Sequence, residues 1–190
     1  EAAFVMVSVL EEQKAILEEL FPEKFSYTPN RNSFDYVYLA ENLITLRGKK
    51  LLENADVIIY AGSLVNPELL SYAKEDCEIH NSAYMTLDEV ISVIENAENK
   101  GRNTVRLHTG DPSLYGAIRE QMDRLEELGI AYEICPGVSS FCGAAAALKA
   151  EYTLPDVSQT VIITRMAGRT PVPEKEDIEK LAAHGATMVI

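Results

Sequence analysis

Basic residues are scarce in this sequence of 190 residues. It has 17 Lys and Arg against 30 Asp and Glu, a formal net charge of −13 at pH 7. Nucleic-acid binding needs clustered positive charge to neutralise phosphates, so the composition argues against DNA or RNA as a partner. The sequence also lacks the ~18–20 consecutive apolar residues of a membrane span and opens on no basic-then-apolar leader. We therefore expect neither a membrane partner nor a signal peptide.

Cysteine is scarce as well. Cys77, Cys135 and Cys142 are an odd number, widely spaced, and form no CxxC pair. This pattern predicts reduced thiols in a cytoplasmic protein, without a structural zinc or another metal site. A Walker loop, a GxGxxG fingerprint, an HExxH pair and a GxSxG elbow are also missing. ATP, NAD, metal-hydrolase and serine-hydrolase functions therefore lack support.

The sequence does contain a regular alternation of strand-like and helix-like runs. Strands are predicted at residues 36–40, 56–61, 78–81, 104–108, 131–135, 160–164 and 186–190. Helices are predicted at residues 43–54, 67–74, 86–99, 114–128, 140–150 and 174–184. Thr86 and Glu89 form a capping box at one helix start. The alternation predicts an α/β fold with largely parallel sheets, in which ligands bind beyond the carboxyl ends of the strands.

The most informative segment is the loop TGDPS at residues 109–113, after the predicted strand 104–108. Gly110 lets the backbone come close to a ligand. The helix predicted from Leu114 would offer free N–H groups to a carboxylate or a hydroxyl. Asp111 can accept hydrogen bonds from an ammonium group or a ribose hydroxyl. The alternative is a tight turn capped by Asp111, and the segment alone does not decide between the two.

Two further loops carry polar side chains after predicted strands. Ser139 and Ser140 stand at a predicted helix start, where serines are commonly caps and can also bond a ligand. Arg165 and Arg169 lie in the proline-stiffened segment 164–174. Arginines on a rigid loop suit a substrate with several carboxylates, although ordinary surface charge is the alternative for either one. The three histidines form no cluster in the sequence.

Six segments together form a specific set: LITLRG (43–48), ADVIIYAGSLV (55–65), VRLHTGDPSLYGAI (105–118), PGVSSF (136–141), QTVIITR (159–165) and GRTPVPE (168–174). With them, the sequence from about residue 36 to residue 190 resembles the tetrapyrrole (precorrin) methylases, which transfer a methyl group from S-adenosylmethionine. The combination of HTGDPSLYG with GRTPVPE is similar to the branch that methylates C11 of precorrin-4 or cobalt-precorrin-4 in cobalamin synthesis.

The resemblance implies a fold, a cofactor and a substrate. It implies two α/β domains, usually in a homodimer, with S-adenosylmethionine in the cleft between them and an acidic tetrapyrrole over its mouth. By position, the first cofactor-binding loop is matched by Thr109, Gly110, Asp111 and Leu114, and the second by Ser139 and Ser140. Arg165 and Arg169 would meet the substrate carboxylates. No residue is assigned to catalysis, because in-line positioning of donor and carbon nucleophile supplies most of the rate.

The resemblance also divides the chain. Residues 1–33 match nothing in the family and form an N-terminal extension. Residues 34–136 correspond to the N-terminal α/β methylase domain. Residues 137–190 correspond to the linker helix and the start of a C-terminal α/β domain, which is incomplete here because the family continues further.

A glycine-rich loop that follows the family's first strand is missing between Ala40 and Glu41, while the pattern fits on both sides. We expect an omitted segment there, with the two Cα atoms well beyond the ~3.8 Å of adjacent residues. Two alternatives remain open. One is a truncated, non-catalytic α/β paralogue that binds a nucleoside or a partner, and the other is a methylase acting at another position of a tetrapyrrole.

Overall fold

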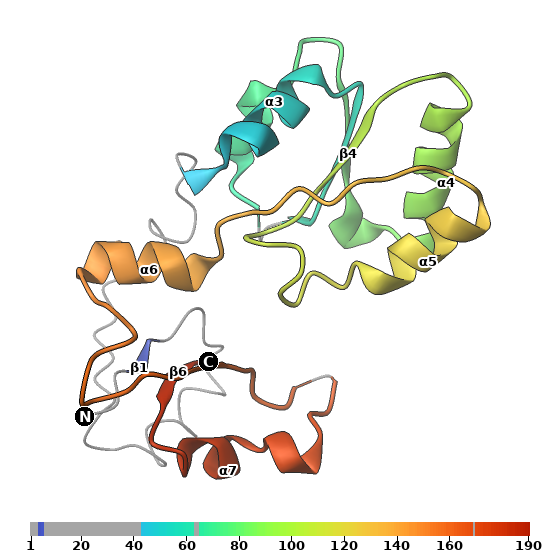
Figure 1. Ribbon diagram of the computed structural model, residues 1–190. Helices are drawn as coiled ribbons and strands as arrows, with labels where there is room; N and C mark the ends of the chain where they lie inside the picture. The colour runs from blue at the N-terminus through green and yellow to red at the C-terminus, as the bar shows by residue number, and fades with distance from the viewer. Residues whose placement is uncertain (1–3, 6–42, 63–64, 169) are drawn as a thin grey trace. The chain divides into compact units, whose positions relative to one another are not determined.

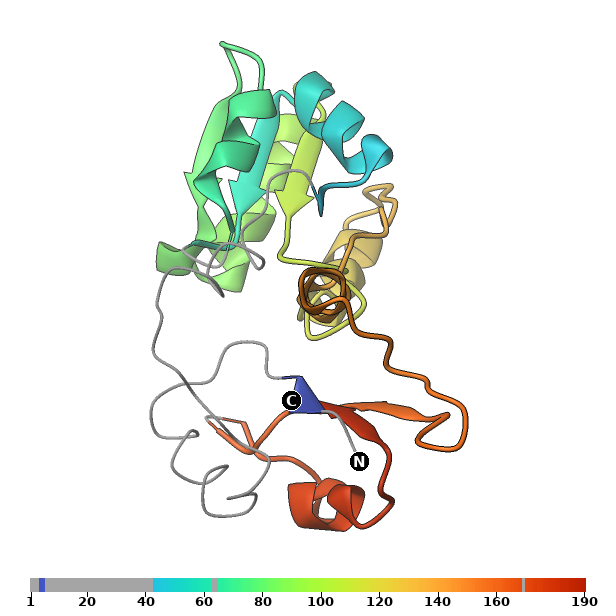
Figure 2. The same cartoon turned by 90° about the vertical axis from the view of Figure 1, so that its left-hand side faces the viewer.

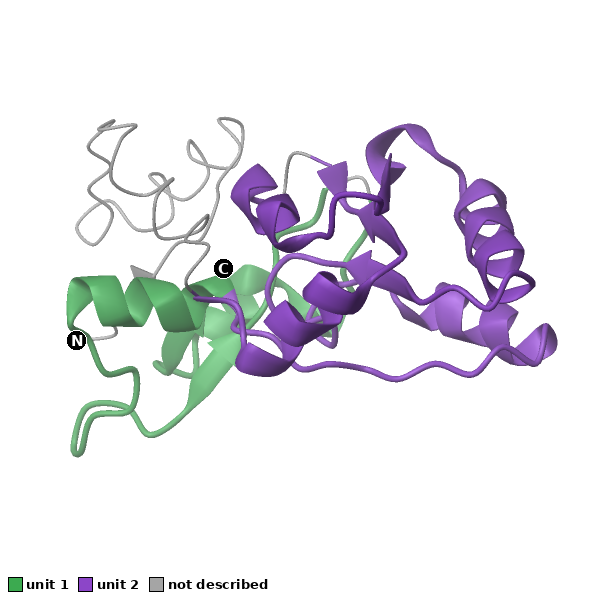
Figure 3. Cartoon of the chain, turned by 90° about the horizontal axis from the view of Figure 1, so that it is seen from above, with its two compact units in different colours: residues 1–38, 140–190 green, residues 39–139 purple. Residues whose placement is uncertain are grey.

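The computed structural model describes residues 4–5, 43–62, 65–168 and 170–190. It divides the chain into two units (Figures 1 and 3). Unit 2 is residues 39–139, and unit 1 combines residues 140–190 with residues 1–38. Each unit holds a three-stranded sheet in which all described pairings are parallel. The predicted α/β fold with parallel sheets is confirmed.

The sheet of unit 2 has the strand order β3-β2-β4. Its strands are β2 (Val57–Tyr60), β3 (Glu78–Asn81) and β4 (Thr104–Leu107). In the central strand, Val57, Ile58 and Ile59 are all buried. A strand covered on both faces needs apolar residues on both faces, which explains why the continuous run VIIY stands here.

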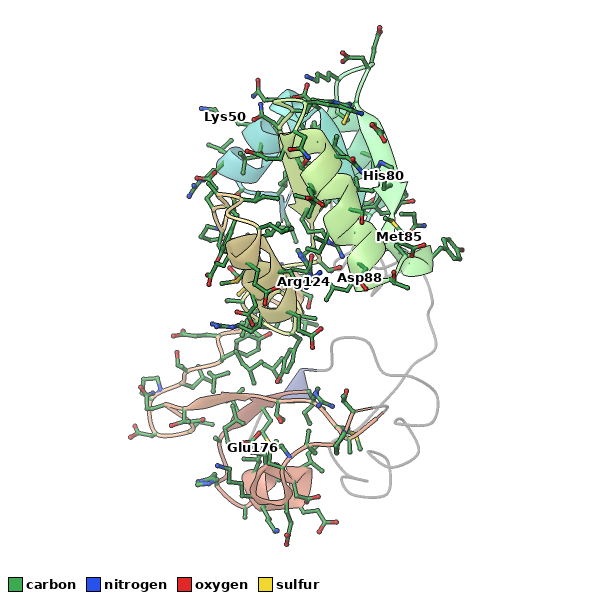
Figure 4. All side chains as sticks on the ribbon, turned by 90° about the vertical axis from the view of Figure 1, so that its right-hand side faces the viewer. Lys50, His80, Met85, Asp88, Arg124 and Glu176 are labelled. Atoms are coloured by element: carbon green, nitrogen blue, oxygen red, sulfur yellow. The ribbon has the colours of Figure 1, made fainter. Side chains whose placement is uncertain are left out.

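Helices cover both faces of this sheet (Figure 2). On one face, α3 (Leu46–Asn54) and the 3₁₀ helix η3 (Pro67–Tyr72) lie over a cluster that contains Leu52 and Ile58. On the other face, α4 (Leu87–Glu98) packs Val90 and Ala97 onto Val57 and Ile59. The capping box predicted for Thr86 and Glu89 is present at the start of α4. The helix α5 (Arg119–Glu127) contacts α4, and Arg124 reaches the Asp88 carboxylate at 3.6 Å (Figure 4).

The sheet of unit 1 has the order β1-β6-β5. Its strands are β1 (Phe4–Val5), β5 (Val161–Ile163) and β6 (Thr187–Val189). The described residues of this unit also form α6 (Ser140–Leu148), the 3₁₀ helix η5 (Glu174–Glu176) and α7 (Ile178–Ala182). All three residues of β6 are buried, and the Thr187 hydroxyl donates to the Tyr152 carbonyl at 2.8 Å.

Four sequence-based elements need correction. The predicted strand 131–135 is not a strand, because among the described residues β4 pairs only with β2 and no strand forms backbone pairing with this segment. The helix predicted from residue 114 begins at Arg119, because Tyr115 and Ala117 adopt left-handed backbone conformations (φ 57° and 49°) that an α-helix cannot include. The segment 67–74 forms the 3₁₀ helix η3 instead of an α-helix, and the segment 174–184 is interrupted at Asp177, whose side chain caps α7.

The predicted strand 36–40 and the junction of Ala40 with Glu41 lie outside the described residues. Within the described ranges, no helix has the length and apolar character needed to cross a membrane.

Candidate functional site

Asp111 joins two loops of unit 2. It bonds Gly137, which lies 26 residues further along the chain. One carboxylate oxygen accepts from the backbone N–H of Gly137 at 3.0 Å. The other accepts from the backbone N–H and the hydroxyl of Ser113, at 2.9 and 2.5 Å. The Asp111 backbone N–H donates to the Ser139 hydroxyl oxygen at 3.2 Å. The two loops that the sequence singled out separately therefore form one site, which we call the joined loops (residues 109–113 and 136–139).

Two glycines allow this close approach. A Cβ atom added to Gly137 would lie 2.1 Å from the Gly110 carbonyl oxygen, a distance that real Cβ atoms essentially never show. A Cβ atom added to Gly110 would lie 3.1 Å from the Ser139 Cα atom, and Gly110 has a left-handed φ of 64°. Only glycine satisfies both requirements at residue 110. The glycine of the TGDPS loop thus serves loop-to-loop packing in this structure.

Thr45, at the start of α3, also contacts the joined loops. The Thr45 hydroxyl caps this helix by accepting from the Gly48 N–H at 3.1 Å. It also donates to the Pro136 carbonyl at 3.4 Å. Sequence analysis missed Thr45, although threonine is one of the residues that typically cap the start of a helix. The joined loops therefore rest on the amino end of α3.

The electrostatics of the site depend on the Asp111 carboxylate. Hydrogen bonds from Ser113 and from the Gly137 backbone lower the pKa of Asp111 below its ordinary value. The group is therefore anionic at neutral pH. A carboxylate has about four acceptor positions, and three are filled by protein donors, so about one is left for a ligand.

The other cofactor-site candidates divide between the units. Thr109 is half-buried between β4 and Gly110, and Leu114 closes the turn by donating its N–H to the Asp111 carbonyl at 3.1 Å. Ser140 is the first residue of α6 and belongs to unit 1, whereas Ser139 belongs to unit 2. The structure thus brings Gly110, Asp111 and Ser139 together within one unit.

The arginine candidates belong to unit 1. Arg165 bonds the backbone of its own loop, because its guanidinium donates to the carbonyls of Thr170 and Pro171 at 3.0 and 2.9 Å. These bonds hold the loop in shape and use part of the donor capacity that a substrate carboxylate would need. Arg169 lies outside the described residues.

His108 stands directly before the TGDPS loop. Burial, together with the charge of Arg106, lowers the pKa of His108 to about 4. The imidazole is therefore neutral across the physiological range. Among the described residues, no group of three or more His, Cys, Asp or Glu side chains is placed to hold a metal ion. All three cysteines are free thiols.

Comparison with known proteins gives consistent matches. The family model of the tetrapyrrole (corrin/porphyrin) methylases matches residues 39–190. The cobalt-precorrin-4 C(11)-methyltransferase of Methanocaldococcus jannaschii is 63% identical over 148 residues, which are 78% of this chain and 57% of that relative. A solved cobalt precorrin-4 methyltransferase is 49% identical with a TM-score of 0.75, and the match covers 78% of this chain and 62% of that one.

A uroporphyrin-III C-methyltransferase from Thermus thermophilus, solved with S-adenosylhomocysteine, is 24% identical with a TM-score of 0.54 over 70% of this chain and 54% of that one. At this level of identity, the likeness shows a shared fold and nothing about function. The chain spans 57% and 62% of the length of the two more similar proteins.

Proposed function

The chain belongs to the tetrapyrrole (corrin/porphyrin) methylase family, and we propose that it is the part of a methyltransferase that methylates C11 of precorrin-4 or cobalt-precorrin-4 in cobalamin biosynthesis. The observation that carries the proposal is the pair of joined loops after β4 and before α6. Open α/β sheets bind their ligands at such loops, beyond the carboxyl ends of the strands. The relatives with the highest identity reported above act on this substrate by name.

The donor groups of the joined loops fit S-adenosylmethionine as the methyl donor. The free acceptor position of Asp111 suits a ribose hydroxyl or an ammonium group, and the Ser139 hydroxyl keeps its proton for donation. When bound, the sulfonium group supplies an electrophilic methyl group to the nucleophilic carbon of the substrate. Thr109, Gly110, Asp111, Leu114, Ser139 and Ser140 orient this donor, and in-line orientation provides most of the rate.

Two arginines would bind the carboxylates of the acidic tetrapyrrole. Arg165 and Arg169 provide the local positive charge that a polyacid needs on a protein of net charge −13. We further assign the protein to the cytoplasm, as its few and widely spaced cysteines predict, and to a homodimer, as the family resemblance implies.

Two measurements test the proposal in order. Titration calorimetry with S-adenosylhomocysteine tests the donor site, and methyl transfer to precorrin-4 and to cobalt-precorrin-4, followed by mass spectrometry, tests the reaction and the metal preference. Binding together with a mass gain of one methyl group supports the proposal. Binding without transfer to either substrate would instead support the non-catalytic paralogue. Absence of binding would refute the assignment of the joined loops as the binding site of the methyl donor.

A further inference from the structure

Arg106 places a positive charge within the sheet of unit 2. It lies in β4 directly opposite Ile59 of β2, which is completely buried against the α4 face. Burial lowers the pKa of the Arg106 guanidinium, as expected for a charge removed from water. An arginine in such a position costs stability relative to an apolar residue. Its contacts show what it does there.

The guanidinium bonds four neutral oxygen atoms. It donates to the carbonyl of Ile59 at 3.0 Å and to that of Leu107 at 3.4 Å. It also donates to the Ser82 hydroxyl oxygen at 3.0 Å, in η4 (Ser82–Tyr84), and to the Gln121 side-chain oxygen at 3.1 Å, in α5. No carboxylate of the described residues forms an ion pair with it. Arg106 therefore ties β2, β4 and η4 to α5.

Gln121 extends this connection toward the joined loops. Its amide nitrogen donates to the Ala117 carbonyl at 3.1 Å, while its oxygen accepts from Arg106. Ala117 lies in the turn that leads from the TGDPS loop to α5. The two bonds fix both ends of the Gln121 amide, so Arg106 reaches this turn through a single side chain.

The turn at residues 115–117 is conformationally demanding. Tyr115 and Ala117 both have left-handed φ values, 57° and 49°. Each such residue costs of order 1 kcal/mol and persists only when its surroundings fix it. Gly116 between them leaves no room for a side chain, since a Cβ atom there would lie 2.2 Å from the Pro112 carbonyl oxygen. The Gln121 bond to Ala117 is one contact that fixes the turn.

We propose that Arg106 is a positioning residue for the cofactor site, acting through Gln121 on the left-handed turn at residues 115–117 and thereby on the TGDPS loop. The proposal rests on the proposed function for the identity of the ligand, and S-adenosylhomocysteine is the probe used to test it. The structural part stands on the Arg106–Gln121–Ala117 contacts alone. Neither residue needs to touch the cofactor.

The substitution Gln121→Glu separates positioning from stability. A carboxylate strengthens the bond to Arg106 and suits the first turn of α5, but it cannot donate to the Ala117 carbonyl. We expect the thermal midpoint to stay the same or rise while the Kd of S-adenosylhomocysteine rises about fivefold. Arg119→Gln is the matched control, because it makes the same change in net charge on the exposed side of α5. Equal affinity of Gln121→Glu and wild type would overturn the proposal.

Hydrogen exchange supplies a readout that does not depend on the ligand. The Leu114 N–H, bonded to the Asp111 carbonyl at 3.1 Å, reports on the loop before the turn. We expect its exchange to be about fivefold faster in Gln121→Glu and Arg106→Met, and to recover partly in Arg106→Lys. Unchanged exchange in the first two variants refutes the positioning role. If the wild type fails to bind S-adenosylhomocysteine, the proposed function fails, and the exchange rates still decide on Arg106.

Discussion

The Asp111 carboxylate and the Gly137 backbone N–H lie 3.0 Å apart, and their hydrogen bond joins the loop after β4 to the loop before α6. Both oxygens of the carboxylate accept from protein groups. The acid of the TGDPS motif is therefore a structural link between two loops as well as a candidate ligand for the methyl donor.

Replacing Asp111 with Ala should weaken S-adenosylhomocysteine binding by more than the ~1 kcal/mol of a lost cap, which is more than about fivefold in Kd. The reason is that the substitution removes the Ser113 and Gly137 bonds together. Calorimetric titration measures the effect. Asp123→Ala, which removes a carboxylate paired with Arg119 on α5, serves as the control and should leave Kd unchanged. Wild-type affinity in a folded Asp111→Ala protein would contradict the assignment.

Replacing Gly137 with Ala should force the joined loops apart, because the new Cβ atom would lie 2.1 Å from the Gly110 carbonyl oxygen. Overpacking of this kind costs about 1–3 kcal/mol, visible as a lower urea midpoint and as weaker binding of S-adenosylhomocysteine. Gly168→Ala is the control, since no atom of the described residues lies within 4 Å of a Cβ atom there. A Gly137→Ala protein as stable as Gly168→Ala would show that the loops do not pack this closely.

The arginine assignment separates substrate from cofactor. Arg169→Ala should raise the KM for the tetrapyrrole and leave S-adenosylhomocysteine affinity nearly unchanged, because a charge-assisted bond to a carboxylate contributes roughly 1.5–3 kcal/mol. Arg165→Ala should show the same split together with loss of order in its loop, whose carbonyls it bonds. Steady-state kinetics and calorimetry provide the two readouts. A loss of cofactor affinity in Arg169→Ala reverses the roles.

His108 should make the stability of the protein depend on pH. Its pKa is about 4 in the folded protein, against the ordinary histidine value of 6.5, so the unfolded chain binds the proton first as pH falls. The contribution to the free energy of unfolding is complete above pH 6.5 and is lost progressively toward pH 4. By pH 5 the loss is about 2 kcal/mol.

Urea unfolding at pH 7 and pH 5 measures this contribution. The variant His108→Gln should flatten the difference between the two pH values, whereas His184→Gln, at an exposed position after α7, should keep it. An unchanged difference in His108→Gln would assign the pH dependence to other groups.

Thr104→Val should stabilise the protein by about 1 kcal/mol, because the Thr104 hydroxyl is buried and has no hydrogen-bond partner among the described residues. Valine has nearly the same shape and carries no polar atom to desolvate. Thermal unfolding checks the sign, and Thr104→Ser, which keeps the hydroxyl and loses a methyl group, should be less stable than wild type. A destabilised Thr104→Val protein would imply that the hydroxyl has a partner.

Sequence patterns predicted the elements whose causes are local. The strand at residues 78–81 was predicted with its observed bounds, and the capping box at Thr86 needs only residues three apart. The strand predicted at residues 131–135 was wrong because a strand forms only beside another strand that pairs with it, and the alternation of residues along one segment does not show whether such a partner exists. The helix start at Leu114 was wrong because the left-handed turn before α5 depends on tertiary contacts.

The candidate site follows the same division. Gly110, Asp111 and Ser139 were found through motifs, but the bonds that join them cross 26 to 28 residues of chain. Arg106 reads as one charged residue in an apolar strand, and its partners lie on three other elements. No pattern within a short window contains that information. The domain boundaries at residues 33 and 136 stay predictions.

The hydrogen bond between Asp111 and Gly137 closes a ring of chain that contains the whole of α5. Closing a flexible segment of this length costs about 3 kcal/mol of conformational entropy. This entropy is lost when the protein folds, before any ligand binds. A molecule that binds the joined loops therefore encounters a preorganised surface, and more of its contact energy remains as affinity.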